Sequence, residues 1–139
     1  MSKIPDGTYY IVNRILSPKG ERLAITFNGD NKVATLTALT NAESQKWKIE
    51  TYPGKPETQY VSPIPNGALQ AGTTGFPGPM TVLPFNAYIW SIYSSDTGYT
   101  IKDAGNKWLW GATAADVGEQ VGIGKDGPSE SQRWVFTKV

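Results

Sequence analysis

Histidine and cysteine are both absent from the 139-residue sequence. Histidine is the commonest general base and metal ligand, and cysteine supplies the thiolate nucleophile. Their absence therefore excludes Ser-His-Asp and Cys-His catalysis and an ordinary zinc site. The 12 acidic residues stand mostly in turn-like contexts without a distinctive pairing, which is typical of solvated surface. We expect a protein that is not an enzyme and that uses no metal or cofactor.

Strong charge of one sign and long apolar runs are also absent. The 13 basic residues are interspersed with the acidic ones, the formal net charge is +1, and no two lysines or arginines are adjacent. A nucleic-acid-binding footprint is therefore missing. No apolar stretch approaches the roughly 18 residues of a membrane span, and the first residues show no signal-peptide core. The expected location is the cytoplasm, with unconventional secretion left open.

Three tryptophans mark an internal repeat. Trp47, Trp90 and Trp134 lie 43 and then 44 residues apart, a period typical of repeated supersecondary units. Large aromatic residues at regular strand positions form cores, so we expect three units, at about residues 6–51, 52–94 and 95–139, each ending near a buried tryptophan. Gln45 and Gln132 are expected to hydrogen-bond to backbone within their repeats, because an unpaired buried amide costs ~1–3 kcal/mol.

Short β-branched and aromatic segments between turn residues predict strands and no long helix. Three four-stranded units are too few for a propeller, which needs about four or more blades. They can close as a six-stranded barrel capped by three hairpins, which removes exposed strand edges. The predicted fold is all-β, a β-trefoil of twelve strands, with equivalent core positions at Ile11/Val61/Ile101, Leu23/Leu69/Leu109, Leu36/Val82/Val121 and the three tryptophans.

The Gln-x-Trp triplets at 45–47 and 132–134 resemble those of ricin-B-like trefoils. Segments 7–14, 98–102 and 132–136 resemble the small cysteine-free trefoils of mushrooms, which include serine protease inhibitors of the cospin and cnispin type as well as fungal lectins. The resemblance covers the whole chain, and it implies the fold more sharply than the activity, because one fold hosts both. The second repeat departs from the pattern, since Tyr88 replaces its glutamine.

We expect a single-domain monomer. The inhibitor resemblance implies a rigid exposed loop that mimics a substrate and fills the pocket of a trypsin-family serine protease. Two loops match this use, and their candidate pocket-filling residues are Asn28 and Lys125; lysine suits a pocket with an aspartate floor. An ordinary Asn-Gly turn and a solvated loop lysine are the competing interpretations, and Lys19 and Lys55 are weaker candidates. The flanking loop residues are Phe27, Gly29 and Asp30 in the first loop, and Gly124 and Asp126 in the second.

The alternative hypothesis is a glycan-binding lectin of the same fold. Ricin-B-like sugar sites typically use an aspartate just after the second strand of a repeat with a stacking aromatic ring, and none of segments 23–25, 69–71 and 109–111 carries that aspartate. Asn106, Trp110 and Asp116 of the third repeat are the alternative sugar site, with strand packing as the competing role of Trp110. A module that binds neither ligand is the third possibility. We rank protease inhibition first.

Overall fold

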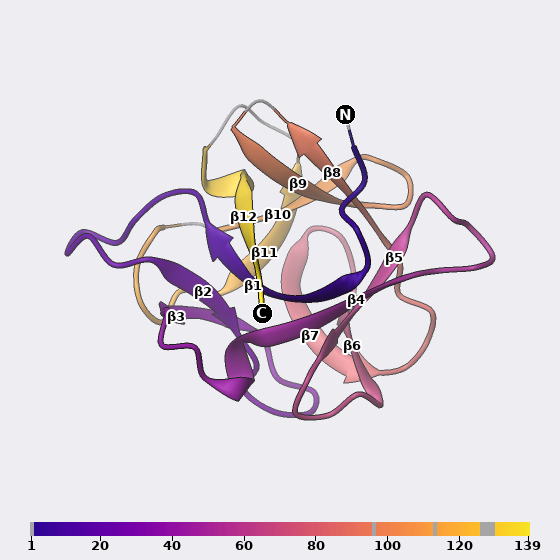
Figure 1. Cartoon of the computed structure of the whole chain (residues 1–139), viewed down its shortest axis with the longest axis horizontal. Coiled ribbons are helices and arrows are strands. Elements are labelled where there is room, and N and C mark those ends of the chain that lie inside the picture. Colours follow the sequence, from indigo (N-terminus) through magenta and orange to yellow (C-terminus); the bar gives the residue numbers. More distant parts are fainter. Residues whose placement is uncertain (1, 96, 113, 126–129) are drawn as a thin grey trace.

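The computed structural model describes residues 2–95, 97–112, 114–125 and 130–139 (Figure 1). Apart from strands, the regular structure in this part of the chain consists of two 3-10 turns, η1 (Glu43–Gln45) and η2 (Glu130–Gln132), and no helix is long and apolar enough to cross a membrane. The strands are β1 (Gly7–Asn13), β2 (Leu23–Thr26), β3 (Thr35–Ala38), β4 (Lys46–Thr51), β5 (Gln59–Pro63), β6 (Leu69–Thr73), β7 (Gly78–Pro84), β8 (Trp90–Ser95), β9 (Gly98–Asp103), β10 (Trp108–Ala112), β11 (Val121–Lys125) and β12 (Trp134–Lys138).

Six strands close a barrel. Strand β1 pairs with β4, β4 with β5, β5 with β8, β8 with β9, β9 with β12, and β12 again with β1, all antiparallel. The first and last strands of the chain are thus neighbours, and Tyr9 lies opposite both Trp47 and Lys138. Closure pairs both edges of every barrel strand, which removes the unpaired edges of an open sheet.

The other six strands form three hairpins that cap the barrel. These hairpins are β2–β3, β6–β7 and β10–β11. Each hairpin also contacts the other two, so the cap has the threefold arrangement of the barrel. This architecture is the predicted β-trefoil. The pairs that join the hairpins are Val33–Thr81, Gly122–Pro79 and Thr35–Gln120.

The three repeat tryptophans make the same hydrogen bond. Each indole is at most 1% exposed, and its Nε1–H donates to a carbonyl on the adjacent hairpin strand. An indole N–H buried in a core needs such a partner, so the repeat confirms that these tryptophans are core residues. The three donor–acceptor pairs are Trp47–Ile25 (2.9 Å), Trp90–Ala71 (2.9 Å) and Trp134–Trp110 (3.1 Å).

The shared carbonyl acceptors also correct the predicted alignment of the third repeat. Two residues before each acceptor stand Leu23, Leu69 and Trp108. Trp108 is therefore the counterpart of the two leucines, and the predicted Leu109 is one residue off. Likewise Ile123, which pairs with Trp110, takes the place predicted for Val121. The connections between strands differ in length from repeat to repeat, and a slip of one residue moves a strand's side chains to the opposite face.

The predicted glutamine contacts are confirmed. Gln45 is 2% exposed; its Oε1 accepts from the Thr40 amide at 2.9 Å, and its Nε2 donates to the Ala38 carbonyl at 2.9 Å. In the third repeat, Gln132 Nε2 donates to the Lys125 carbonyl at 2.7 Å. Both glutamines therefore tie the segment before a core tryptophan to the hairpin of the same repeat.

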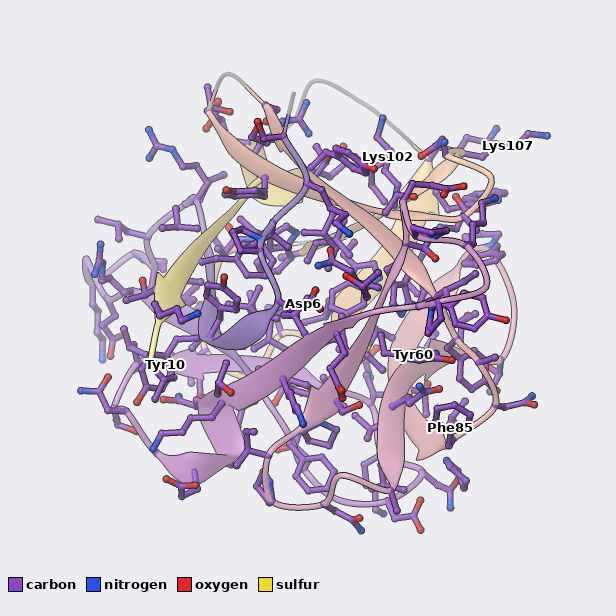
Figure 2. The ribbon with its side chains drawn as sticks, turned by 45° about the vertical axis from the view of Figure 1, so that its right-hand side comes forward. Asp6, Tyr10, Tyr60, Phe85, Lys102 and Lys107 are labelled. Carbon is purple, nitrogen blue, oxygen red and sulfur yellow. The ribbon has the colours of Figure 1, made fainter. Side chains whose placement is uncertain are left out.

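The segment before β1 is fastened to the barrel through Asp6 (Figure 2). The Asp6 carboxylate accepts from the Thr51 amide at 3.0 Å, the Thr51 hydroxyl at 2.7 Å and Gln59 Nε2 at 3.0 Å. Burial acts to raise the pKa of Asp6, but these hydrogen bonds and the charge of Lys3 outweigh it, so the pKa lies below the ordinary 3.8. The carboxylate form of Asp6 thus stabilises the junction of β1, β4 and β5.

Candidate functional site

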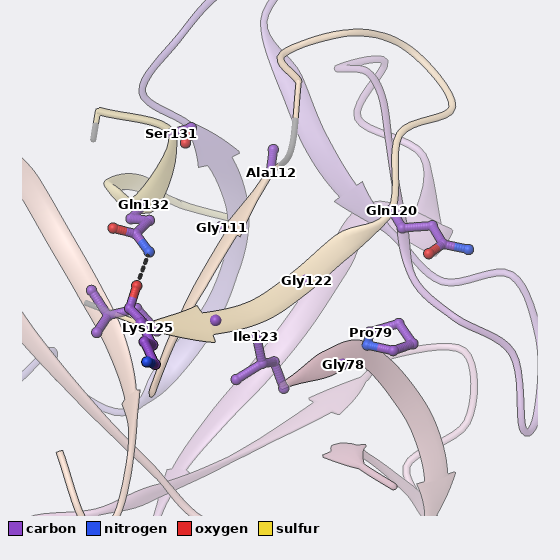
Figure 3. A pocket seen from close by; sticks show the side chains of 12 residues that line it. Gly78, Pro79, Gly111, Ala112, Gln120, Gly122, Ile123, Lys125, Ser131 and Gln132 are labelled. Atoms are coloured by element: carbon purple, nitrogen blue, oxygen red, sulfur yellow. Dashed lines mark hydrogen bonds between the residues drawn. The ribbon is translucent and has the colours of Figure 1, made fainter. Parts of the chain in front are cut away.

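Two surface depressions differ in their chemistry. The larger, of about 550 Å³, lies between β7, β10, β11 and η2, and none of the described residues that line it is aromatic (Figure 3). The smaller, of about 250 Å³, is lined by Phe76, Tyr88 and Trp90 together with Thr73 and Asp103. Binding sites for small molecules are largely apolar and aromatic, with a few polar groups that fix orientation. The smaller depression fits that description better, despite its size.

Tyr88 lies directly on Gly72. A Cβ atom added to Gly72 would be 2.7 Å from Cδ2 of the Tyr88 ring, so only glycine allows the ring to lie this close to the strand. Tyr88 occupies the repeat position of Gln45, because each lies two residues before its repeat tryptophan. Gly72 occupies the position of Thr26, because each follows the residue whose carbonyl accepts from that tryptophan. Where the first repeat has the hydrogen-bonded amide of Gln45, the second repeat therefore has an aromatic ring packed on a glycine backbone.

A buried glutamine holds the loop that carries Tyr88. Gln70 is 1% exposed, and its Oε1 accepts from the amides of Asn86 at 3.3 Å and Tyr88 at 3.2 Å. Between them, Ala87 has φ 53°, a left-handed conformation that costs roughly 1–2 kcal/mol for a residue with a side chain. The two bonds to Gln70 hold the loop in this shape and fix the Tyr88 ring at the depression.

Phe76 and Trp108 extend the aromatic surface. Their rings are stacked, with centroids 5.8 Å apart and an interplanar angle of 5°, and Phe76 is 41% exposed. Trp108 is half-buried at the position that a fully packed leucine holds in the other repeats. Thr73 shapes the Phe76 loop, because its hydroxyl donates to the Gly75 carbonyl at 2.6 Å and accepts from the Gly75 amide at 3.0 Å.

Asp103 supplies the carboxylate of the depression. It accepts from the amides of Gly105 at 3.1 Å, Lys107 at 2.8 Å and Trp108 at 2.8 Å. A carboxylate offers about four acceptor positions, so one remains for a ligand hydroxyl. Within the described ranges, no three acidic side chains gather as metal ligands. The arrangement suits a ligand with one apolar face and several hydroxyl groups.

A second aromatic cluster includes Phe85, which lies in the same β7–β8 loop as Tyr88. The Tyr60 ring is 5.3 Å from that of Tyr52 and 5.2 Å from that of Phe85, with interplanar angles of 60° and 57°; Figure 2 labels Tyr60 and Phe85. Phe85 is 59% exposed, but neither depression includes these residues. Their rings are tilted against one another and offer no common flat face.

The structure does not bring together the predicted sugar site in the third repeat. Trp110 is 0% exposed and packs edge-on against Trp90, with centroids 5.1 Å apart, so the stacking role predicted for it is wrong. Asn106 and Asp116 are exposed but lie beyond opposite ends of β10, and five strand residues span roughly 16 Å. These three residues therefore form no common site.

Asn28 does not have the free tip expected of a pocket-filling residue. Its Nδ2 donates to the Val33 carbonyl at 3.0 Å and to Thr35 Oγ1 at 2.9 Å, so the side chain is tied back to its own hairpin. Entry into a protease pocket would break both bonds. Of the flanking residues, Phe27 packs against the core, Gly29 has φ 124°, and Asp30 is exposed.

Lys125 is a strand residue rather than a loop tip. It ends β11 opposite Trp108, and its carbonyl accepts from Gln132. Gly124 before it belongs to the same strand, whereas Asp126 lies outside the described residues. Both described residues of the second predicted loop are therefore strand residues, and the backbone of Lys125 is held by two neighbouring elements.

Sequence reasoning missed the aromatic depression. Phe76 and Tyr88 come from two loops of the second repeat, whereas Asp103 and Trp108 flank one turn of the third, and only closure of the barrel brings the two repeats together. One signal was present, because Tyr88 breaks the glutamine pattern of the repeats. The glycine at position 72, which makes room for the Tyr88 ring, had no recognisable significance before the pairing was known.

The closed barrel with its three capping hairpins defines a β-trefoil protein. A family model described as "CCL2 lectin-like" matches residues 7–134, and the chain belongs to this CCL2-like family. No curated protein matches the chain significantly.

Several solved structures share the fold. A mosquitocidal holotoxin is 14% identical with a TM-score of 0.84 over 98% of this chain, which spans only 18% of that toxin. The Rhizoctonia solani agglutinin is 16% identical with a TM-score of 0.79, over 100% of this chain and 99% of its own. A Macrolepiota procera ricin B-like lectin in complex with lactose is 18% identical with a TM-score of 0.78, over 99% of this chain and 100% of its own. At these identities the likeness shows the fold alone.

Proposed function

We propose that the chain is a non-catalytic lectin that binds a glycan in the depression formed by Phe76, Tyr88 and Asp103. The observation that carries the proposal is the Tyr88 ring, which lies so close to Gly72 that a Cβ there would be 2.7 Å from it, beside a carboxylate with acceptor capacity. A pyranose presents a face of C–H groups that packs on an aromatic ring, while its hydroxyls need hydrogen-bond partners. The depression supplies both kinds of contact.

Family membership supports this choice over protease inhibition. The matching family model describes a lectin, and a ricin B-like lectin of the same fold was solved with lactose. The two inhibitor candidates gain no comparable support, because the Asn28 side chain is hydrogen-bonded back to its hairpin and Lys125 belongs to a strand. The volume of about 250 Å³ is below the roughly 300–1,000 Å³ of drug-sized pockets, which suits one or two sugar rings.

A glycan array followed by calorimetric titration tests the proposal. We expect the wild type to retain one class of glycan and Tyr88→Ala to lose about ten- to thirty-fold in affinity, as for a central anchor residue. Tyr60→Ala is the matched control, since it removes a half-buried tyrosine outside the depression. Tyr88→Phe keeps the ring and isolates the hydroxyl.

Absence of binding to every glycan, or equal losses in Tyr88→Ala and Tyr60→Ala, would overturn the proposal. A trypsin-family protease panel is run with the same preparations. Inhibition that disappears in Asn28→Ala or Lys125→Ala would restore the inhibitor hypothesis for that loop.

A further inference from the structure

Two lysines border the Phe76–Trp108 pair. Lys125 lies directly opposite Trp108 in the β10–β11 register, so the two side chains project from the same face of the hairpin. Lys107 precedes Trp108 in the β9–β10 turn and points outward at the upper right of Figure 2. Both lysines are exposed, and neither forms an ion pair within the part of the chain that the structure describes.

The acid in the same turn does not neutralise these lysines by pairing. The Asp103 carboxylate faces three backbone amides, those of Gly105, Lys107 and Trp108, which fixes its position in the turn. Among the described residues, the edge of the aromatic surface therefore carries the ammonium groups of Lys107 and Lys125 and the Asp103 carboxylate, whose contacts are with backbone.

The larger depression begins where the aromatic surface ends. Lys125 lines it, together with Gln120 and Gln132 and the glycines of β11 (Figure 3). A Cβ atom on Gly124 would meet nothing within 4 Å, so the floor beside Lys125 is open backbone. With about 550 Å³ and no aromatic lining, this space suits the hydrophilic, charged part of a ligand rather than a stacked sugar face.

We propose that the glycan held over Tyr88 and Phe76 carries an acidic substituent, a carboxylate or a sulfate ester, which Lys125 binds at the mouth of the larger depression. Lys107 adds positive charge at the same edge. This inference rests on the proposed lectin function and deepens it by naming an acidic class of glycan. A charge-assisted contact of an exposed ammonium group is directional but modest, and it weakens as salt screens it.

Matched neutral, sulfated and carboxylated forms of one glycan backbone provide the test. After an array identifies the backbone that the wild type retains, the three forms are titrated at about 20 mM and about 500 mM salt, where the Debye length falls from roughly 20 Å to 4 Å. We expect an acidic form to bind at least three-fold more tightly at low salt, and Lys125→Ala to remove most of that preference. Affinity for the neutral form should stay unchanged. The sulfated and carboxylated arms identify which group is preferred.

Two further variants separate a local contact from general attraction. Lys125→Arg should retain the acidic preference, whereas Lys19→Ala, which removes the same charge from an exposed turn of the first repeat, should not affect it. Equal affinity for neutral and acidic forms, or equal losses in Lys125→Ala and Lys19→Ala, would overturn this inference and leave the lectin proposal standing. Failure to bind any glycan would overturn both.

Discussion

Tyr88 covers Gly72 so closely that a methyl group at position 72 would lie 2.7 Å from the ring. The substitution Gly72→Ala must therefore push the ring away from the strand. We expect about a ten-fold loss of glycan affinity, measured by calorimetry, with the fold retained by circular dichroism. Gly67→Ala is the control, because a Cβ there meets nothing within 4 Å; unchanged binding in Gly72→Ala would show that the position of the ring is unimportant.

Gln70 positions the Tyr88 loop without lining the depression. In Gln70→Leu the amides of Asn86 and Tyr88 lose their shared acceptor, and we expect both a loss of stability of about 1–3 kcal/mol and weaker glycan binding. Urea unfolding and calorimetry on the same samples measure the two effects. An exposed glutamine replaced in the same way, Gln120→Leu, should leave stability nearly unchanged, and a normal glycan affinity in Gln70→Leu would contradict the positioning role.

The indole N–H of each repeat tryptophan donates a hydrogen bond that holds the core together. Trp47→Phe leaves the Ile25 carbonyl without its partner in a fully buried place, so we expect at least ~1–3 kcal/mol of destabilisation. Trp108→Phe makes the same chemical change at a half-buried ring that stacks on Phe76 and should destabilise less. Equal losses of unfolding free energy in guanidinium would show that the shared hydrogen bond contributes little.

Asp6 makes the free energy of unfolding depend on pH in the acidic range. Its pKa in the folded state lies below the ordinary 3.8, so its contribution is fully present above the pKa of the unfolded chain and disappears as pH falls through the folded pKa. We expect Asp6→Asn to be less stable than the wild type at pH 7 and the difference to vanish at strongly acidic pH. Asp30→Asn, an exposed loop change, provides the control; a pH-independent difference for Asp6→Asn would contradict the assignment.

The sequence pattern was sufficient for the architecture because three tryptophans at equal spacing can share one environment only if three similar units surround it. The same reasoning placed Gln45 and Gln132 correctly. It misplaced Leu109 by one residue and Val121 by two, since unequal connections shift the hairpin register. The one-residue error also reversed the face assigned to the β10 side chains. Trp110 followed the same error, and a residue predicted to meet a sugar lies in the core.

The aromatic depression was beyond the reach of local patterns. Phe76 and Trp108 are 32 positions apart in the sequence, and taken alone each is an ordinary aromatic residue in a loop or at the start of a strand. Their stacking depends on how neighbouring repeats meet around the barrel. A departure from the repeat, such as Tyr88 in place of glutamine, is the most useful local sign, because structural positions stay alike in all three units while a site needs only one unit to change.

Because the fold repeats three times, the third repeat offers a place where a second aromatic platform could be built. In the third repeat Gly111 already lies under Gln132, where an added Cβ would be 2.8 Å from Cγ of the glutamine, so the bare backbone required by an aromatic platform exists there before any platform does. Replacing that single glutamine by tyrosine would place a second aromatic ring on bare backbone, and under the proposed lectin function such a variant is a starting point for a chain that cross-links glycans.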